Sequence, residues 1–585
     1  RQWYRYHHLF ADFLRTQLSN RAPLHQKAAQ WYAENGLTRE AITHALAAEA
    51  FDLAVELILS VADQMLQGSE VVTLLNWVKR LPDQFVRTSY QLSTYKGWGA
   101  FLLSQMDRAA SYAQSAEDVA DADYAPLTAL RASLALVDGD VANAIELSMD
   151  GLEQIEGTPG YARNQLFRNA LLNNLGEVLW LSGETQKAVK YFRQAIYLEN
   201  RISSDVAAYV ALWNLASLLH LQGEREEAMR LGQRGLDQCQ ATFGPQSPFA
   251  ALMHLVLGMG HYEANQLSDA EPHLVTGLEL SLELRKLSGR GVTLNAHAIY
   301  AQLQQASKRY DDALKTLQEA KQLTQLPPDT SFVRSIRAIE AKVHLQQGNM
   351  GAAVRWAEGV TLSFERYPEY MLENEQLIYA RVLLAQNKPA QAQTLLAQLE
   401  QFTRQRGFNG RLIIIHTLQA RAESALGDTK QALTTLSQAV RLAAPNHYRR
   451  IFIEEGQEGE QGPAIANLLP QVRHIAPTFV SSLLQPPQPT PSPSPNQPSN
   501  APFARRASSA RRACLPLTRP LIEPLSEREL EVLQLIAQGF TNQQIADHIF
   551  LSLSTVKWHT GNIYGKLGVR KRTQAVARAR ELSLL

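Results

Sequence analysis

The sequence has few of the features that mark an extracellular, membrane or metal-dependent protein. Only two of its 585 residues are cysteine, Cys239 and Cys514, and they lie far apart in dissimilar contexts. We therefore expect no disulfide framework, structural zinc site or cysteine redox pair, and we expect a reducing cytoplasm as the compartment. No apolar run reaches the roughly 18 residues of a membrane span. No signal peptide is recognisable at the first residues, so no membrane contact is expected.

The sequence also lacks a large net charge, but its charges are unevenly distributed. Lys and Arg number 57 against 56 Asp and Glu. Residues 1–484 sum to −6, residues 485–518 to +4, and residues 519–585 to +3 from nine basic and six acidic side chains. A small basic end on a mildly acidic body suggests that nucleic-acid contact is confined to the C-terminal part.

An internal repeat organises most of the chain, and strand-like alternation is almost absent. A turn residue is followed five positions later by alanine, and successive alanines are 40, 42, 43, 40, 39 and 40 residues apart. The pairs are Gly183/Ala188, Gly223/Ala228, Asn265/Ala270, Lys308/Ala313, Gly348/Ala353, Asn387/Ala392 and Gly427/Ala432, with weaker copies at Gly139/Ala144 and Gln105/Ala110. Each copy reads as two helices around a turn, with the small alanine allowing close packing. The pattern resembles tetratricopeptide (TPR) repeats with lengthened helices, which implies an all-α solenoid with a concave face for a ligand.

The composition changes abruptly after residue 484. Eight of the 26 prolines fall within residues 485–502, and Arg505, Arg506, Arg511 and Arg512 follow. This segment predicts a semi-rigid, solvated linker. A proline-rich ligand for an adaptor domain is the less favoured alternative. The basic stretch is interpreted equally well as a weak phosphate contact or as merely solvated.

Residues 519–585 carry helix-start signals at short spacing. Ser526 and Glu529 fit a capping box, with Leu525 and Leu530 at the staple positions and Gly539 as the helix end. Thr541 and Gln544 repeat the box for a short helix ending near Ile549, and Ser552 caps a third helix.

The third helix has two distinct faces. Leu553, Val556, Ile563 and Leu567 form an inward stripe, and the other face carries Ser554, Lys557, Trp558 and Gly561. Two capped helices with an exposed polar face on the second are what reading a DNA major groove requires.

The stretch LSERELEVLQLIAQGFTNQQIADHIFLSLSTVKWHTGNIYGKLGVRKRTQAVARARELSLL resembles the LuxR-type helix-turn-helix domain over nearly its full length. The resemblance implies that Lys557, Trp558 and Gly561 face bases and that Thr541, Asn542 and Thr555 contact or position phosphate. Ser554, Thr560 and Lys566 complete the implied DNA-binding set. The last helix, Arg572–Leu582, is implied to supply a dimer contact through Ala575, Val576 and Ala579. Lys571 departs from the usual cap of that helix, so a looser helix start is expected.

The first fifty residues resemble the segment that follows the nucleotide-binding module in large MalT-like regulators of the LuxR family. The motifs are WYRYHHLFADFLRTQL and LHQKAAQWYAENGLTREAITHALAA. No G-x-x-x-x-G-K-[ST] loop occurs, so no ATP site is expected in this chain, although the resemblance implies ATP for the full-length family. The chain is expected to be a piece of a longer protein or a naturally truncated regulator. The expected divisions are the end of a winged-helix-like segment (1–22), a helical arm (23–90), the solenoid (91–484), the linker (485–518) and the DNA-binding domain (519–585).

Other candidate sites favour structural interpretations. His7 and His8 have no further ligand at a recognisable spacing, so packing is preferred over metal binding. His254, His261 and His273 are interpreted as solenoid residues. Tyr191, Trp213 and Tyr262 are interpreted as core residues, with a ligand groove as the less favoured alternative.

The leading functional hypothesis is a sequence-specific transcription regulator, an activator, that binds double-stranded DNA as a homo-oligomer. Its solenoid would sense a small-molecule or protein effector, and RNA polymerase would be a partner. The alternative is a TPR-like scaffold in which DNA binding is secondary. A nucleotide hydrolase, and enzymatic function in general, is not expected because the phosphate-binding loop is missing.

Overall fold

The computed structural model describes residues 21–67, 71–102, 105–119, 124–156, 165–198, 201–202, 206–244, 247–288, 291–324, 331–360, 373–456 and 465–484. In the C-terminal part it describes residues 525, 527–549, 553–567, 569, 571–582 and 584–585. The His7–His8 pair and the proline-rich and basic linker lie outside these ranges.

The first described helices form an arm that precedes the repeats. They are α2 (Ala22–Glu34), α3 (Thr38–Ala47), α4 (Phe51–Gln67), α5 (Val71–Arg80) and α6 (Asp83–Arg87). One continuous cluster of buried apolar residues, from Ala29 to Tyr112, joins this arm to the first pair of repeat helices.

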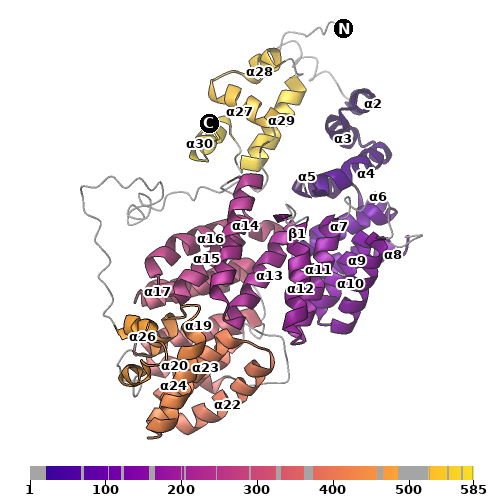
Figure 1. Ribbon diagram of the computed structural model, residues 1–585. Coiled ribbons are helices and arrows are strands. Elements are labelled where there is room, and N and C mark those ends of the chain that lie inside the picture. The colour runs from indigo at the N-terminus through magenta and orange to yellow at the C-terminus, as the bar shows by residue number, and fades with distance from the viewer. Residues whose placement is uncertain are drawn as a thin grey trace.

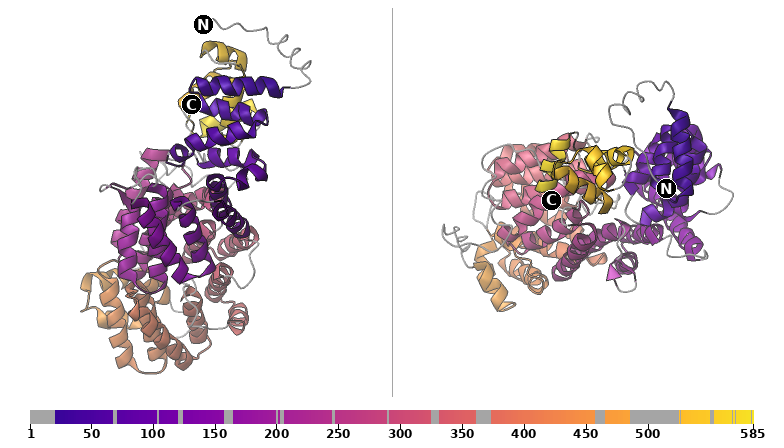
Figure 2. Two further views of the ribbon diagram at one scale, coloured as in Figure 1. Left: turned by 90° about the vertical axis from the view of Figure 1, so that its right-hand side faces the viewer. Right: turned by 90° about the horizontal axis from the view of Figure 1, so that it is seen from above.

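Antiparallel helix pairs then stack one after another, and Figures 1 and 2 show the stack curving into a superhelix. The pairs are α7 (Tyr90–Leu102) with α8 (Met106–Glu117), α9 (Ala125–Asp138) with α10 (Val141–Glu156), α11 (Gln165–Leu181) with α12 (Thr185–Ile196), and α13 (Val206–Gln222) with α14 (Arg225–Phe243). They continue with α15 (Ala250–Glu263) and α16 (Leu267–Ser288), α17 (Gly291–Ala306) and α18 (Tyr310–Thr324), α19 (Ser331–Gln346) and α20 (Met350–Glu358), α21 (Glu373–Ala385) and α22 (Pro389–Gln405), and α23 (Asn409–Ala425) and α24 (Thr429–Ala443). The prediction of an all-α repeat solenoid is confirmed. The described residues also include an antiparallel pair of two-residue strands, β1 (Tyr197–Leu198) and β2 (Arg201–Ile202).

The turn pattern read from the sequence corresponds to a backbone requirement. The turn residues from Gly139 to Gly427 have φ between +59° and +86°, a left-handed conformation that favours glycine and, less strongly, asparagine. The paired alanines from Ala144 to Ala432 are completely buried. Each turn therefore reverses the chain, and each alanine allows the second helix to approach the first closely.

The weakest copy of the repeat is corrected by one residue. Gln105 has a negative φ and is the N-cap of α8, so it corresponds to the residue after the left-handed turn position in the other copies. The buried alanine of this copy is consequently Ala109, whereas Ala110 is exposed.

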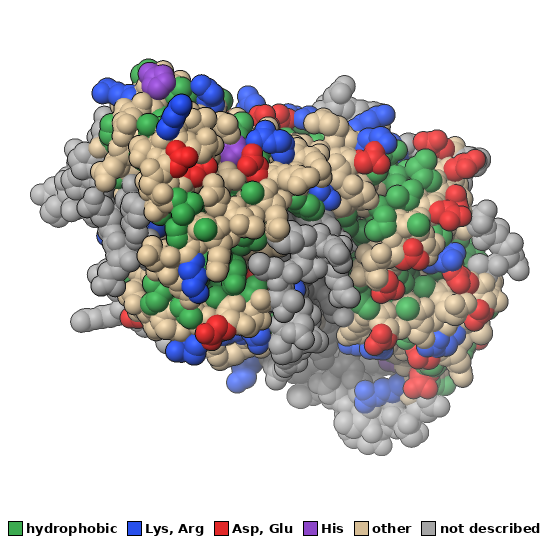
Figure 3. Space-filling model, turned by 90° about the horizontal axis from the view of Figure 1, so that it is seen from below, with side chains coloured by type: hydrophobic (Ala, Val, Ile, Leu, Met, Phe, Trp, Pro, Cys, Tyr) green, Lys and Arg blue, Asp and Glu red, His purple; other side chains and the backbone are tan. Residues whose placement is uncertain are grey.

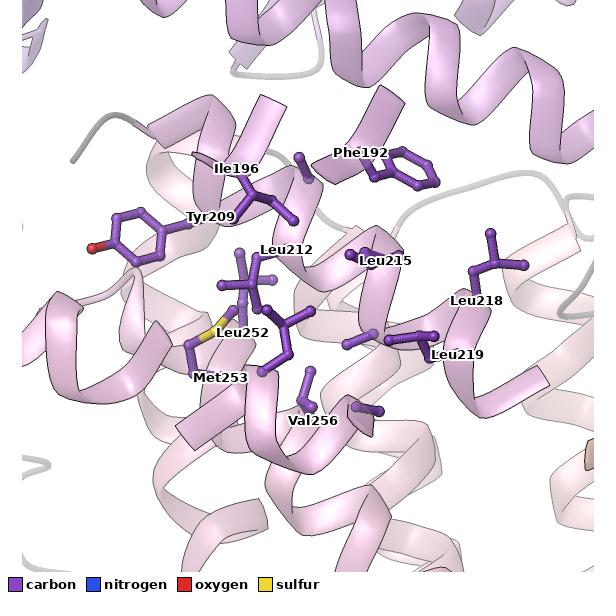
Figure 4. Close-up of a cluster of buried hydrophobic side chains, with 14 of the residues drawn as sticks. Phe192, Ile196, Tyr209, Leu212, Leu215, Leu218, Leu219, Leu252, Met253 and Val256 are labelled. Carbon is purple, nitrogen blue, oxygen red and sulfur yellow. The ribbon is translucent and has the colours of Figure 1, made fainter. Parts of the chain in front are cut away.

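The core of the solenoid runs between successive pairs rather than around one centre. Helix α13 illustrates this, because its apolar residues lie on nearly all sides and contact α12, α14, α15 and α23. Figure 4 shows Leu212, Leu215 and Leu219 of α13 among side chains from neighbouring repeats, such as Phe192 and Val256. Burial between neighbours on this scale is what stabilises a stack of individually insufficient repeats.

Shorter elements follow the repeats. They are α25 (Arg450–Glu455), the 3₁₀ turns η2 (Ile465–Asn467) and η3 (Leu469–Val472), and α26 (Pro477–Leu484). Their apolar residues join those of α23 and α24 in one cluster that ends the stack. Among the described residues, no helix is both long and apolar enough to cross a bilayer.

The C-terminal part folds as four helices: α27 (Glu527–Ala537), α28 (Asn542–His548), α29 (Leu553–Leu567) and α30 (Arg572–Glu581).

Seen from below, the molecule shows acidic and basic side chains interspersed, with no large area of one sign on that face (Figure 3). This agrees with the near-cancelling charge of the sequence.

Candidate nucleic-acid interface

The four C-terminal helices enclose a small apolar core. Its buried members come from all four helices and the residues beside them: Leu525, Val532, Leu533, Leu535, Ile536, Ile545, Ala546, Ile549, Val556, Ile563, Leu567, Ala575, Ala579 and Leu582. The inward stripe expected on the third helix is confirmed for Val556, Ile563 and Leu567, which are at most 2% exposed. This core sets the positions of α28 and α29 relative to each other.

The predicted start of α28 is present in full. The Gln544 amide donates to Thr541 Oγ1 at 3.3 Å, and the Thr541 amide donates to Gln544 Oε1 at 2.8 Å. The two residues thus satisfy each other's backbone amides as a capping box. Gly539, at φ +91°, ends the preceding helix as expected. The cap leaves Thr541 exposed at the start of the two-helix unit.

Helix α29 carries most of the residues expected to contact DNA. Ser554, Thr555, Lys557 and Trp558 lie within it, but their side chains fall outside the described part of the structure. Gly561 is exposed, and a Cβ built on it would meet nothing within 4 Å. The glycine therefore leaves the backbone of α29 open to close approach at this position.

The structure corrects one of the expected DNA contacts, Thr560, and pairs another, Lys566, within the domain, so that the contact of Lys566 with DNA stays a prediction. Thr560 is 5% exposed, and its hydroxyl donates to the Val556 carbonyl at 2.7 Å, so it faces the core. Lys566 Nζ donates to Glu529 Oε2 at 2.8 Å, and the two side chains are 13% and 4% exposed. Lys566 thus joins α29 to α27. Glu529 was expected to complete the first capping box with Ser526, a residue outside the described ranges.

The expected dimer contact is also corrected. Ala575 and Ala579 are completely buried in the domain's own core, so their side chains are not available to a second copy. Val576 is half-buried and stays a prediction. At the start of α30, the Lys571 amide donates to Gln574 Oε1 at 3.1 Å. A side-chain acceptor therefore caps this amide although Lys571 itself is basic.

Sequence reasoning missed Arg572, which links three helices. Its guanidinium donates to Asn542 Oδ1 at 3.1 Å, to the Ile536 carbonyl at 3.3 Å and to the Phe540 carbonyl. A hydrogen bond from α30 therefore fixes the side chain of Asn542, the residue expected to contact phosphate. In the sequence, the arginine at the start of that helix gave no indication of which residues it would contact.

His559 is a second residue that the sequence did not single out. It is 6% exposed, and burial lowers the pKa of its imidazole, an effect that Glu529 opposes. His559 consequently belongs to the interior of the domain, on the side of α29 away from Gly561.

A separate cavity of about 170 Å³ lies on the inner side of the superhelix, in the part of the chain that the structure describes. Helices α13, α15, α17, α19, α23 and α25 contribute to its lining. Trp213 and Tyr262 line it, as the ligand-groove alternative required, whereas Tyr191 instead packs against the core between repeats. Of the three aromatic residues considered for a ligand groove, two therefore line the cavity and one does not.

The polar groups around this cavity are strongly desolvated. Burial and the nearby Arg225 lower the pKa of His220 to about 4, so its imidazole is neutral at pH 7. Burial raises the pKa of Glu263, against the influence of Arg411 and Lys342. The Val256 backbone opposes this lowering of the His220 pKa only in part. The cavity wall therefore places desolvated polar groups next to aromatic surface.

The three histidines that the sequence analysis assigned to the solenoid pack against one another. His254 Nδ1 and His273 Nδ1 are 3.0 Å apart, and the His261 ring stacks on His273. Burial and the neighbouring His273 lower the pKa of His254 to about 4. The described residues contain no group of three or more His, Cys, Asp or Glu side chains arranged to hold a metal ion.

Comparison with known proteins finds a matching family for the solenoid and another for the C-terminal domain. A family model described as the MalT-like TPR region matches residues 126–473, and one described as bacterial regulatory proteins of the luxR family matches residues 523–579. The chain is 25% identical, over 611 aligned residues, to the HTH-type transcriptional regulator MalT of Cronobacter sakazakii (strain ATCC BAA-894). The alignment covers 99% of this chain and 64% of that relative, so the chain spans under two thirds of the relative's length.

Solved structures overlap only loosely with this one. A Rap protein complexed with competence and sporulation factor has a TM-score of 0.44 at 10% identity, covering 61% of this chain and 98% of its own. The hetero-tetramer Cut9–Hcn1 has a TM-score of 0.32 at 12% identity, covering 80% and 97%. Neither overlap is close enough to carry an argument about this chain.

Proposed function

The chain belongs to the family of MalT-like TPR regions, and from this and its luxR-family domain we propose that it is a sequence-specific, DNA-binding transcription regulator. Its solenoid senses an effector, and it acts in the cytoplasm without catalysing a reaction of its own. The observation that carries the proposal is the capped α28–α29 unit. The packed face of α29 lies in the core, and Gly561 is open on the outside.

Reading of DNA by this unit follows from its geometry. A helix fits into the major groove, and side chains on its outer face reach base edges. Ser554, Lys557, Trp558 and Gly561 share one helical face by their spacing, so we assign base contact to that face of α29. Thr541 and Asn542, at the start of α28, are assigned to the phosphate backbone.

The sensing role is assigned to the cavity inside the superhelix. A concave, partly apolar hollow with a few convergent polar groups is the usual form of a small-molecule site. Trp213 and Tyr262 supply the aromatic surface, and His220 supplies polar groups. We further propose that the regulator is an activator that self-associates on DNA and contacts RNA polymerase, as its kinship with a transcriptional regulator suggests.

In vitro selection from a random duplex pool, followed by fluorescence anisotropy at two salt concentrations, tests the DNA-binding part. We expect the full chain to enrich one sequence pattern and to bind it in a strongly salt-dependent way. A Lys557→Ala, Trp558→Ala double variant should lose at least about tenfold in affinity for that pattern, since a good base contact is worth about 1–3 kcal/mol.

The matched control is Lys187→Ala, which removes the same charge from an exposed position on the solenoid. It should bind as the wild type does. Enrichment of the same pattern by the double variant would refute the assignment of α29. If neither protein binds any duplex at either salt, the regulator proposal fails and the scaffold alternative gains support.

A further inference from the structure

Successive turns of the superhelix touch along one line, which we call the seam. It joins residues 183–185, 220–226 and 263–265 to residues 406–410 and 446–450. In Figure 1 the magenta helix α13 and the orange helix α23 belong to the two sides of this line, and contacts between them are present. The first side consists mainly of turns within helix pairs, and the second of loops that precede or follow a pair. One edge of the ribbon of repeats therefore rests on the opposite edge, one superhelical turn later.

The backbones approach most closely at Gly410. A Cβ on this residue would lie 2.3 Å from the His220 carbonyl oxygen and 3.1 Å from the Gly223 nitrogen. Real Cβ atoms do not come that close to backbone, so any other residue at this position forces the two turns apart. Gly410 lies in the first turn of α23 and has no positive φ, so local backbone conformation does not require glycine here. The close contact across the seam is what requires glycine at this position.

Hydrogen bonds connect the two edges along the whole line. The Tyr448 hydroxyl donates to the His220 carbonyl at 3.0 Å, and the Arg449 amide donates to the Glu263 carbonyl at 2.9 Å. The further bonds are Arg225 Nε to the Asn446 carbonyl at 2.7 Å, the Glu226 amide to Asn446 Oδ1 at 3.2 Å, Thr185 Oγ1 to the Arg406 carbonyl at 3.3 Å, and an Arg450 guanidinium nitrogen to Asn265 Oδ1 at 3.0 Å.

The seam differs in kind from the contacts between neighbouring pairs. Neighbouring pairs share continuous apolar clusters, whereas the seam consists largely of polar bonds plus one apolar side chain, Phe408, which enters the cluster around α13. Polar groups recover bonds with water when they separate, so their net contribution to closure is modest. The seam is therefore the interface at which the superhelix opens most readily without unfolding a repeat.

Five seam residues also line the inner cavity: His220, Leu221, Glu263, Gly410 and Tyr448. Ligand pockets usually measure roughly 300–1,000 Å³, whereas this cavity is about 170 Å³. An effector of ordinary size consequently needs the turns to move apart. His220 thus supplies a carbonyl to the seam and also lines the cavity.

We propose that the seam is a reversible closure of the superhelix that controls access to the inner cavity. With the seam shut, the cavity is too small for an effector of ordinary size. With the seam parted near Gly410, the cavity widens enough to admit one. The purpose of this closure rests on the sensing role proposed above, but the closure itself is measurable without an effector or DNA.

Reactivity of a cysteine in the cavity wall measures this access. Ser335 is 5% exposed and lines the cavity, so we would introduce Ser335→Cys in a Cys514→Ser background of the full chain. The reaction with Ellman's reagent is then compared with and without Gly410→Ala, after subtracting the slow signal of the buried Cys239. We expect Gly410→Ala to accelerate the reaction about tenfold or more, because the rate follows the population of the open form.

Gly351→Ala is the matched control. Gly351 is likewise the second residue of a repeat helix, α20, and its Cβ would meet only the end of Arg355 at 3.4 Å. It should leave the thiol rate unchanged. Hydrogen exchange gives a second reading: the amides of Glu226 and Arg449 should lose protection in Gly410→Ala and keep it in Gly351→Ala.

If Gly410→Ala lowers the helical circular-dichroism signal, Tyr448→Phe replaces it, since this variant deletes only the bond to the His220 carbonyl. It should also accelerate labelling. Equal labelling rates in the wild-type and folded seam-variant backgrounds, with unchanged exchange at Glu226 and Arg449, would overturn the proposal. That result would leave the proposed DNA-binding function intact, because no step of the test involves DNA.

Discussion

A buried group of ion pairs beside the seam allows a quantitative prediction. Glu455 Oε1 accepts from Arg381 Nε at 2.7 Å, and Arg421 pairs with the other carboxylate oxygen. The three side chains are 3%, 9% and 9% exposed. Next to them, Glu454 accepts from Lys342 Nζ at 2.7 Å, with both side chains similarly buried. These pairs fix the short helix α25, which begins at the seam, against α19, α21 and α23.

The perturbation is Glu455→Gln, which keeps the shape of the side chain and removes its charge. Arg381 and Arg421 are then left in the interior without their carboxylate. Loss of one partner of a buried pair costs about 3–5 kcal/mol, mostly because the remaining charge is uncompensated. We expect Glu455→Gln to lower the free energy of unfolding by about 3 kcal/mol or more, in the transition that includes α19–α25.

Urea denaturation followed by circular dichroism measures this change, with Glu227→Gln as the control. Glu227 pairs with Arg193 in solvent, with side chains 38% and 46% exposed, and such a pair contributes at most about 1 kcal/mol. If the two variants lose equal stability, the reasoning from burial is refuted.

The same group of charges has a defined pH dependence. Burial alone would raise the pKa of Glu454, but Lys342, Arg381 and Arg450 outweigh it and lower the pKa to about 2. Because the folded pKa lies below the ordinary value of 4.5, this stabilisation is present above pH 4.5 and is lost as the pH falls toward 2.

Three further predictions concern other parts of the chain. His220 and His254, each with a pKa lowered to about 4 by burial, should destabilise the solenoid as the pH falls from 6.5 to 4, by up to about 3 kcal/mol each. Thermal melts across that range test this, and a melting temperature independent of pH would contradict it. Gly561→Ala should stabilise the C-terminal domain by about 1 kcal/mol, because nothing obstructs the added Cβ, yet weaken DNA binding; unchanged anisotropy titrations would argue against close backbone approach. Lys308→Gly should stabilise the solenoid by roughly 0.5–1 kcal/mol, because Lys308 has φ +60°, and a lower urea midpoint would speak against this.

The features predicted well from the sequence are those set by neighbouring residues. A left-handed turn favours glycine or asparagine at one position, and a capping box needs Thr541 and Gln544 three residues apart. Such patterns are visible in any one copy and are reinforced by repetition every forty residues. The misplaced copy, Gln105/Ala110, has no glycine or asparagine as its turn residue. Lys308 lacks this signal too, but its copy lies between well-marked repeats on both sides, which fix its position.

The errors in the C-terminal domain have a related cause. The DNA-contact and dimer sets came partly from resemblance, and resemblance does not say which side chains one particular core buries. Thr560 lies four residues after Val556 on the same helical face, so the helical period already placed it inward. The burial of Ala575 and Ala579 depended on where α30 comes to lie, and no local pattern contained that information.

The sequence by itself therefore determined the repeat, the turns, the cap of α28 and the inward face of α29, because each depends on residues within about one or two helical turns. Only the tertiary structure decided how far the superhelix closes, because small rotations between repeats accumulate over 190 residues before Gly410 meets His220. The inner cavity, the buried pairs of Glu454 and Glu455, and the links made by Arg572 all follow from such long-range placement.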